Sequence, residues 1–172
     1  MTGRGARETP RHDIKFRGPE AAADAVAILR EAAAHFEARG IEVWTQDELH
    51  EADFALAARA GELVMGHTDG EAAATMLLQP LDLLYWASAA PNTALYVHKV
   101  AVRRAFAGRG WLERLVDFAA AEARARGLPF LRLDTLEGPV LRSLYERLGF
   151  VTLPGPSIPV RGRRLILMER RL

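Results

Sequence analysis

The chain of 172 residues contains no cysteine and only two lysines, Lys15 and Lys99. Without cysteine it can form neither a disulfide framework nor a thiolate metal site, and it has no cysteine nucleophile. Long apolar runs are also missing, because charged residues, glycine or proline interrupt each run before the ~20 residues that a membrane helix needs. We therefore expect no membrane span, no metal ion and no thiol chemistry.

An excess of one charge is missing too, since the net charge is +1 at pH 7. A general nucleic-acid binder carries a concentrated basic excess, so nucleic acid is not an expected partner. Arginines nevertheless gather in two places. We interpret the cluster in residues 161–171 as a solvated face, whereas Arg103, Arg104 and Arg109 share one loop with two glycines.

The first eleven residues lack the apolar core of a secretory signal and carry several charges. We expect residues 1–11 to form a flexible leader and the protein to be cytoplasmic. The composition, 49% hydrophobic and 26% charged, is typical of a globular protein. Because a chain of this length fits one domain with a buried core, we predict a single domain over residues 1–172.

Hydrophobic periodicity along the chain alternates between the strand and helix patterns. The predicted strands cover residues 12–17, 62–67, 72–78, 95–102, 130–134, 150–153 and 164–169, and the predicted helices cover 19–40, 45–61, 112–126 and 140–148. Thr45 and Glu48 have the spacing of a capping box at the start of the second helix. The order β-α-α-β-β-β-α-β-α-β-β predicts an α/β domain in which helices flank a mixed β-sheet.

The loop that follows the strand 95–102 has the features of an anion site. Gly108 and Gly110 allow the backbone to approach a ligand closely, and the helix that begins after them has N–H groups without internal partners. The helix dipole favours negative charge at the same point, and the loop arginines add charge-assisted contacts to phosphate. A pyrophosphate would fit this loop, but the Gly-x-Gly pair taken alone favours the alternative of a glycine-rich turn with solvated arginines.

Two other nucleotide sites fit this loop less well. A dinucleotide-binding Gly-x-Gly-x-x-Gly motif needs glycine or alanine where Glu113 stands, although Asp134 lies at about the expected distance. A Walker A loop needs a Gly-Lys-Ser/Thr sequence that the chain lacks. A nicotinamide-binding enzyme is therefore a distant alternative.

The second half of the chain contains four short segments in a fixed order: Val100-Ala101-Val102, Ala107-Gly108-Arg109-Gly110, Leu131-Arg132-Leu133-Asp134 and Leu144-Tyr145-Glu146-Arg147-Leu148-Gly149-Phe150. With the long helix between them, these segments resemble the GNAT N-acetyltransferase superfamily. The resemblance is strongest over residues 95–153. It implies a GNAT-like mixed sheet flanked by helices.

The resemblance implies that acetyl-CoA is the co-substrate and lies across the strand 95–102. Pantetheine would bond to the backbone near Val100 and Val102, and the pyrophosphate would take N–H groups from the following loop. The implied cofactor-binding residues are Val100, Ala101, Val102, Ala107, Gly108, Arg109, Gly110, Trp111 and Leu112. Three positions depart from the family pattern: Ala107 replaces arginine or glutamine, Leu112 replaces glycine or alanine, and Gly138 replaces a common asparagine.

The implied activity moves an acetyl group from acetyl-CoA to a primary amine by direct attack on the thioester. This reaction needs a neutral amine, a stabilised oxyanion and a proton for the departing thiolate. Tyr145 matches the general-acid tyrosine of the family, and the oxyanion would meet a backbone N–H near Val100. The general base stays open among four residues: His67, His98, Asp134 and Glu137.

The acceptor is expected to be a small-molecule or protein amine. Four aromatic residues fall in the segments that commonly shape the acceptor pocket in the family: Trp44, Phe54, Tyr85 and Trp86. The sequence leaves a homodimer open. It also leaves an alternative function open, a non-catalytic coenzyme A-binding or protein-interaction module on the same fold.

Overall fold

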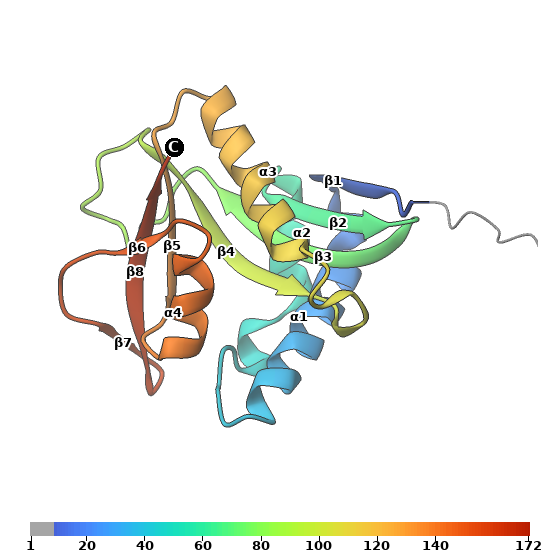
Figure 1. The fold of residues 1–172 in the computed structure, drawn as a ribbon, viewed down its shortest axis with the longest axis horizontal. Coiled ribbons are helices and arrows are strands. Elements are labelled where there is room, and N and C mark those ends of the chain that lie inside the picture. The colour runs from blue at the N-terminus through green and yellow to red at the C-terminus, as the bar shows by residue number, and fades with distance from the viewer. Residues whose placement is uncertain (1–8) are drawn as a thin grey trace, which may run out of the picture.

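The computed structural model describes residues 9–172 (Figure 1). The expected leader lies outside the described residues as far as residue 8. Arg11, at the end of that leader, is held by the first hairpin. Its backbone N–H donates to Asp69 Oδ1 at 2.9 Å, and the Asp69 N–H donates to the Arg11 carbonyl at 2.9 Å. The chain is therefore tied to the domain before its first strand begins.

Within residues 9–172, eight strands form one sheet in the order β1-β2-β3-β4-β5-β8-β6, with β7 also paired to β8. All neighbours are antiparallel except β4 and β5, which are parallel, so the sheet is mixed as predicted. The strands are β1 (His12–Phe16), β2 (Leu63–Thr68), β3 (Glu71–Gln79), β4 (Ala94–Val102), β5 (Phe130–Leu136), β6 (Val151–Thr152), β7 (Ile158–Val160) and β8 (Arg163–Arg171).

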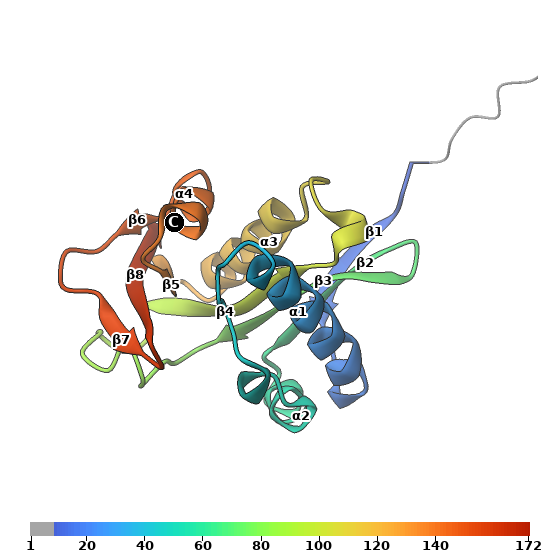
Figure 2. The same ribbon diagram turned by 90° about the horizontal axis from the view of Figure 1, so that it is seen from below.

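Helices cover both faces of this sheet (Figure 2), which confirms the predicted fold class. They are α1 (Ala22–Glu37), α2 (Glu51–Arg59), α3 (Trp111–Ala125) and α4 (Pro139–Glu146). Successive side chains of β2 point to opposite faces of the sheet. Val64 packs into the core with α3, whereas Leu63 and Met65 pack into the core with α1 and α2. In the described part of the chain, no helix has the length and apolar character needed to cross a membrane.

The parallel pair β4 and β5 is joined over only a short length. Ala94, Leu95 and Tyr96 pair with Phe130, Leu131 and Arg132, and the two strands then diverge (Figure 1). A bulge in β4 accompanies the divergence, because Lys99 and Val100 both lie opposite Met76 of β3. Lys99 has a left-handed φ of 50°, which is uncommon for a residue with a side chain. The sheet is therefore open between the later parts of β4 and β5.

The second predicted helix begins later than the capping box indicates. Glu48 does accept the Thr45 N–H at 2.7 Å, but the turn that follows, Gln46–Glu48, is a 3₁₀ helix. Leu49 then leaves the helical conformation and is fully buried, and α2 starts at Glu51. Burial of Leu49 thus interrupts a helix that the local signal alone would continue.

The sequence prediction also missed one strand, because residues 154–159 read as a separator rich in proline and glycine. In the structure β7 pairs with β8 through Ile158, Pro159 and Val160. Proline is tolerated there because an edge strand need not donate on both sides. The observed order therefore has one more strand before β8 than the prediction.

Candidate active site

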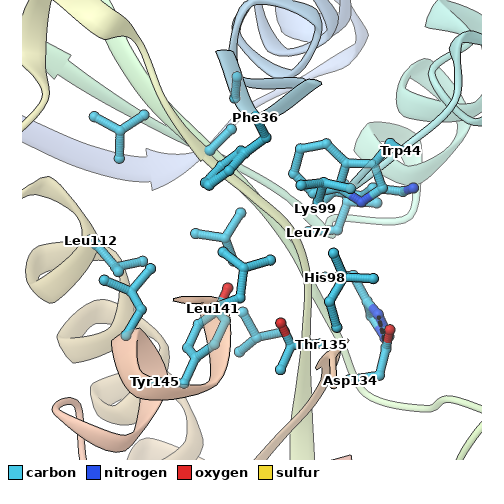
Figure 3. A pocket seen from close by; sticks show the side chains of 18 of the residues that line it. Phe36, Trp44, Leu77, His98, Lys99, Leu112, Asp134, Thr135, Leu141 and Tyr145 are labelled. Carbon is cyan, nitrogen blue, oxygen red and sulfur yellow. Dashed lines mark ion pairs between the residues drawn. The ribbon is translucent and has the colours of Figure 1, made fainter. Parts of the chain in front are cut away.

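A cavity of about 820 Å³ lies where β4 and β5 diverge, and residues 97–102 and 134–136 of these strands line it. One side, called here the helix side, is lined by the start of α3 and by α4. The opposite side, the loop side, is lined by residues of the segments 43–48 and 81–85. Figure 3 shows Tyr145 and Leu112 across the cavity from Trp44 and Lys99.

The loop before α3 presents a row of free backbone N–H groups on the helix side. Gly108 and Gly110 have left-handed φ values of 71° and 77°, which glycine adopts at little cost. Within the described residues, the N–H groups of 108–113 donate to no protein acceptor, and the first such bond runs from Arg114 to Gly110 at 3.1 Å. Free N–H groups at a helix N-terminus form a site for a phosphate.

Trp111 fixes the position of this loop against the sheet. Its side chain is 1% exposed and lies so close to Gly66 of β2 that a Cβ there would overlap the indole ring. The ring also makes an edge contact with His12 of β1, with centroids 5.3 Å apart. The first residue of α3 is therefore anchored by side-chain packing, which leaves its N–H free for a ligand.

The arginines near this loop hold the loop itself as well as adding positive charge. Arg114 donates to the Arg109 carbonyl at 2.7 Å, and the Arg109 guanidinium lies 5.6 Å from the centroid of the Phe106 ring. Arg104 lines the cavity. The loop therefore combines dipoles and cations that favour an anion.

Tyr145 enters the helix side of the cavity from α4. Its ring meets Phe150 edge-on at 5.8 Å, and its hydroxyl makes no hydrogen bond with another described residue. Burial, with a smaller effect of the nearby Asp134 carboxylate, raises the pKa of Tyr145 above its ordinary value. The phenol therefore stays protonated at neutral pH and can act only as a hydrogen-bond or proton donor to an anion.

His98 lies between two carboxylates at the junction of the loop side and the open strands. Its Nε2 is 3.5 Å from Asp82 Oδ2, and its Nδ1 is 3.3 Å from Asp134 Oδ1 (Figure 3 shows the second contact). Asp82 is 8% exposed, and its other oxygen accepts the N–H groups of Leu84 and Tyr85 at 2.9 and 3.0 Å. The loop 81–85 is thereby fixed with one carboxylate oxygen directed at the histidine.

This arrangement suits the uptake and release of a proton. Asp82 Oδ2 and Asp134 Oδ1 are buried and have no hydrogen-bond partner among the described residues, so each can accept a proton-bearing group from the imidazole or from a ligand. The ligand atoms of Asp82, His98 and Asp134 also lie within 4.8 Å of one another, a spacing that a metal ion accepts. One atom from each of the three residues is enough for that spacing, so the same cluster has the donor set of a cation site as well as that of a proton acceptor.

The other two candidate bases lie outside the cavity lining. His67 lies at the end of β2 and lines a separate surface groove, and burial lowers its pKa below the ordinary value. Glu137 is half exposed and pairs with Arg164 at 3.2 Å. Of the four candidates, the structure brings only His98 and Asp134 together in the cavity.

The four candidate acceptor aromatics divide in the same way. Trp44 and Tyr85 line the loop side of the cavity. Phe54 is 2% exposed in the core between α1 and α2. Trp86 packs beside Tyr96, with centroids 5.9 Å apart, and under the Arg132 guanidinium, so it holds the segment 81–86 against the sheet and does not line the cavity.

Sequence reasoning missed an ion pair on the loop side and assigned one of its members to solvent. Arg163 is not on a solvated face, since its side chain is 9% exposed. It donates to Glu48 at 2.7 Å and to the Val43 carbonyl at 2.6 Å. Burial alone would raise the pKa of Glu48, but its hydrogen bonds with Arg163 and the Thr45 N–H outweigh burial and lower the pKa to about 2.

Lys99 is a second group that sequence reasoning did not select. Its ammonium lies 5.4 Å from the centroid of the Trp44 ring, inside the cavity lining. Burial lowers the pKa of Lys99 below its ordinary value. No sequence signal identified it, because a lysine in a strand pattern gives no hint of a left-handed φ.

The three departures from the family pattern leave the backbone donors in place. Ala107 has an extended conformation just before the free N–H groups. Leu112 contributes its side chain to the cavity wall. Gly138 is the extended residue that precedes Pro139 at the start of α4. None of these residues blocks the N–H row.

Comparison with known proteins points to one family. Residues 25–150, more than half of the chain, match the family model described as the acetyltransferase (GNAT) family. The protein described as uncharacterized N-acetyltransferase YesJ of Bacillus subtilis (strain 168) is 30% identical in a match over 100 residues that covers 52% of this chain and 56% of that protein. The match therefore spans little more than half of that relative.

Solved structures share the fold. An acetyltransferase of the GNAT family from Listeria monocytogenes 4b F2365 is similar with a TM-score of 0.71 and 21% identity, over 94% of this chain and 95% of that one. The PaiA N-acetyltransferase of Thermoplasma acidophilum, in complex with coenzyme A, is similar with a TM-score of 0.69 and 12% identity, over 94% of this chain and 99% of that one.

Proposed function

This chain belongs to the acetyltransferase (GNAT) family, and on that premise we propose that it moves the acetyl group of acetyl-CoA to a primary amine. The observation that carries the proposal is the row of free N–H groups in residues 108–113, beside a cavity that opens between β4 and β5. A structure with the same fold holds coenzyme A, which supports the choice of co-substrate.

In this proposal the loop and the open strand edge bind acetyl-CoA. The pyrophosphate accepts hydrogen bonds from the backbone of 108–113, including Gly108 and Gly110. The pantetheine lies along β4 at Val100, Ala101 and Val102, where β5 has diverged and no longer pairs with β4. An extended amide-bearing chain at such an edge takes the place of a missing strand.

In the proposed acetyl transfer, the co-substrate and the proton donor lie on the helix side of the cavity and the amine approaches from the loop side. The amine nitrogen attacks the thioester carbon, the C–N bond forms and the C–S bond breaks. A backbone N–H near Val100 stabilises the oxyanion, and the Tyr145 hydroxyl gives its proton to the departing thiolate. Tyr145 suits this role because its hydroxyl is protonated and free of other partners among the described residues.

We assign the uptake of the amine proton to the cluster of Asp82, His98 and Asp134. Asp134 and His98 line the cavity, and Asp82 holds the far side of the imidazole. The amine passes its proton to Asp134 or His98, directly or through water, before or during its attack. His67 and Glu137 lie outside the cavity lining and take no part.

The experiment that tests the proposal measures release of the coenzyme A thiol from acetyl-CoA against a panel of amines. We expect amine-dependent thiol release and a mass increase of one acetyl group on the accepted amine. Binding of acetyl-CoA without turnover on any amine would instead support the non-catalytic coenzyme A-binding module. Absence of both binding and turnover would contradict the co-substrate itself.

A further inference from the structure

Charged groups on the loop side of the cavity have protein partners, with one exception. Glu48 is paired with Arg163 at 2.7 Å, and Asp82 and Asp134 flank His98. Lys99 lines the same space, yet within residues 9–172 its ammonium takes part in no ion pair or hydrogen bond. It lies over the face of Trp44, 5.4 Å from the centroid of the ring. The loop side therefore holds one ammonium without a direct ion pair or hydrogen bond among the described residues, although the Glu48 and Asp134 carboxylates act on it at longer range.

The other lysine of the chain shows the ordinary arrangement. Lys15 is half exposed, and its ammonium pairs with Asp13 at 2.9 Å. Lys99 differs in burial, in partner and in backbone, since its left-handed φ of 50° costs about 1–2 kcal/mol for a residue with a Cβ. A glycine would adopt that conformation with less strain. The strain belongs to the bulge that opens the sheet, and backbone strain of this kind is concentrated at functional sites.

We propose that the acceptor carries a carboxylate as well as an amine, and that Lys99 binds this carboxylate while the amine faces Asp134 and His98; this inference rests on the acetyl transfer proposed above. A molecule with both groups can give the Lys99 ammonium a direct partner while its amine contacts Asp134 and His98. Trp44 and Tyr85 supply the apolar walls between them. Amino acids are the simplest class with this chemistry.

The alternative partner for Lys99 in the cavity would be a phosphate of the co-substrate. Figure 3 places Lys99 beside Trp44 and across the cavity from Leu112 in the first turn of α3. The phosphate site proposed above lies at that turn, with its own N–H groups and arginines. Position therefore assigns Lys99 to the acceptor.

Burial makes the charge of the Lys99 ammonium responsive to such a ligand. The pKa of Lys99 is lowered because its ammonium is partly removed from water. A carboxylate beside it stabilises the charged form and forms a charge-assisted hydrogen bond. The loss of such a bond weakens binding by about 10- to 100-fold.

The experiment compares kcat/KM for amino acids and their matched carboxamides, which lack the negative charge, with each value calculated on the concentration of neutral amine. The panel contains the standard α-amino acids, short ω-amino acids and simple alkylamines. We expect wild type to prefer at least one acid over its amide by about 10- to 100-fold, mostly through KM. Lys99→Met should remove this preference, and Lys99→Arg should retain part of it. Lys15→Met is the matched control and should behave as wild type.

Three results would overturn the inference. Equal kcat/KM for every acid and its amide in wild type would do so while leaving the proposed acetyl transfer intact, and this comparison needs no variant to fold. An equal loss of kcat on acids and amides in Lys99→Met would show that the lysine acts in proton transfer or structure. Absence of turnover with every amine would remove the proposed function and, with it, this inference.

Discussion

The helix side and the loop side of the cavity are built in different ways. The helix side is made largely of backbone: consecutive N–H groups in residues 108–113, set by two glycines and one anchored tryptophan. The loop side is made of side chains from distant parts of the chain, such as Glu48, His98 and Arg163. A backbone site can bind the same group whatever side chains surround it. One substitution can change the ligand specificity of a side-chain site. We therefore expect the co-substrate to bind on the helix side and the acceptor to be selected on the loop side.

The largest expected effect breaks the backbone site. Gly110→Val places a branched side chain at a φ of 77°, where a Cβ would also come within 3.1 Å of Arg114. We expect the phosphate row to be distorted, so that acetyl-CoA no longer raises the melting temperature of the variant. In wild type, acetyl-CoA at ~100 times its Kd should stabilise the native state by about 2.7 kcal/mol.

Gly127→Val is the matched control for that variant. Gly127 has a similar φ of 69° beyond the other end of α3, and a Cβ there would meet nothing within 4 Å. This control reproduces the backbone strain without touching the loop. It should lower the melting temperature and still respond to acetyl-CoA. A folded Gly110→Val variant with unchanged affinity would contradict the phosphate site.

The next largest effect is expected for a helix-side variant that loses catalysis and still binds acetyl-CoA. Tyr145→Phe keeps the ring packed on Phe150 and removes only the hydroxyl. We expect kcat and kcat/KM for the best acceptor to fall together by ~10²-fold, since a proton donor acts in the transition state, while the KM for acetyl-CoA stays the same. Steady-state kinetics measure both values.

Tyr85→Phe is the comparison variant for Tyr145, because it removes a phenol from the loop side of the same cavity. It should alter the acceptor KM more than kcat. Both variants need a melting curve to show that they fold. Full turnover by a folded Tyr145→Phe would make Tyr145 a packing residue and leave the thiolate to be protonated by water.

The smallest expected effect concerns the stability that the buried ion pair on the loop side adds to the folded protein. Glu48 has a pKa of about 2 in the folded chain against an ordinary value of 4.5, so its pairing stabilises the fold above pH 4.5 and is lost as pH falls toward 2. Glu48→Gln should therefore lower the free energy of unfolding by about 1–2 kcal/mol at pH 7, with the difference narrowing below pH 4.5. Urea denaturation across this pH range measures it.

An exposed ion pair provides the control for Glu48. Glu137 pairs with Arg164 at 3.2 Å, and both side chains are about half exposed. Glu137→Gln should change the free energy of unfolding by less than about 0.5 kcal/mol. An equally small and pH-independent change for Glu48→Gln would mean that the buried pair with Arg163 adds no stability.

The difference between the two sides also explains what the sequence could predict. The helix side depends on local signals, namely a strand, glycines in a loop and an amphipathic helix, so the course of residues 95–126 follows from neighbouring residues. The loop side depends on the fold to bring residues 44–48, 82, 98–99 and 163 together. The sequence placed Arg163 in solvent because nothing nearby in the chain indicates its partner, Glu48.

Conformations set by burial were also beyond local signals. The capping box at Thr45 correctly predicted a helical start, but the burial of Leu49 ended that turn before α2. The left-handed Lys99 has no sequence signature, since that conformation is typical of glycine or asparagine. Such positions can be recognised only when packing is known.

The short parallel pairing of β4 and β5 has a mechanical consequence. Within residues 9–172, strand pairing between β1–β4 and β5–β8 is limited to three residue pairs, Ala94–Tyr96 with Phe130–Arg132, and the Phe130 N–H donates to the Thr93 carbonyl beside them. Beyond them the two half-sheets are held together by side chains, chiefly those of α3 and the core around Trp111 and Phe150. A pantetheine chain bound in the opening would bridge the two half-sheets. The bound co-substrate would then add contacts between the two half-sheets during each reaction cycle, and these contacts would be lost when coenzyme A departs.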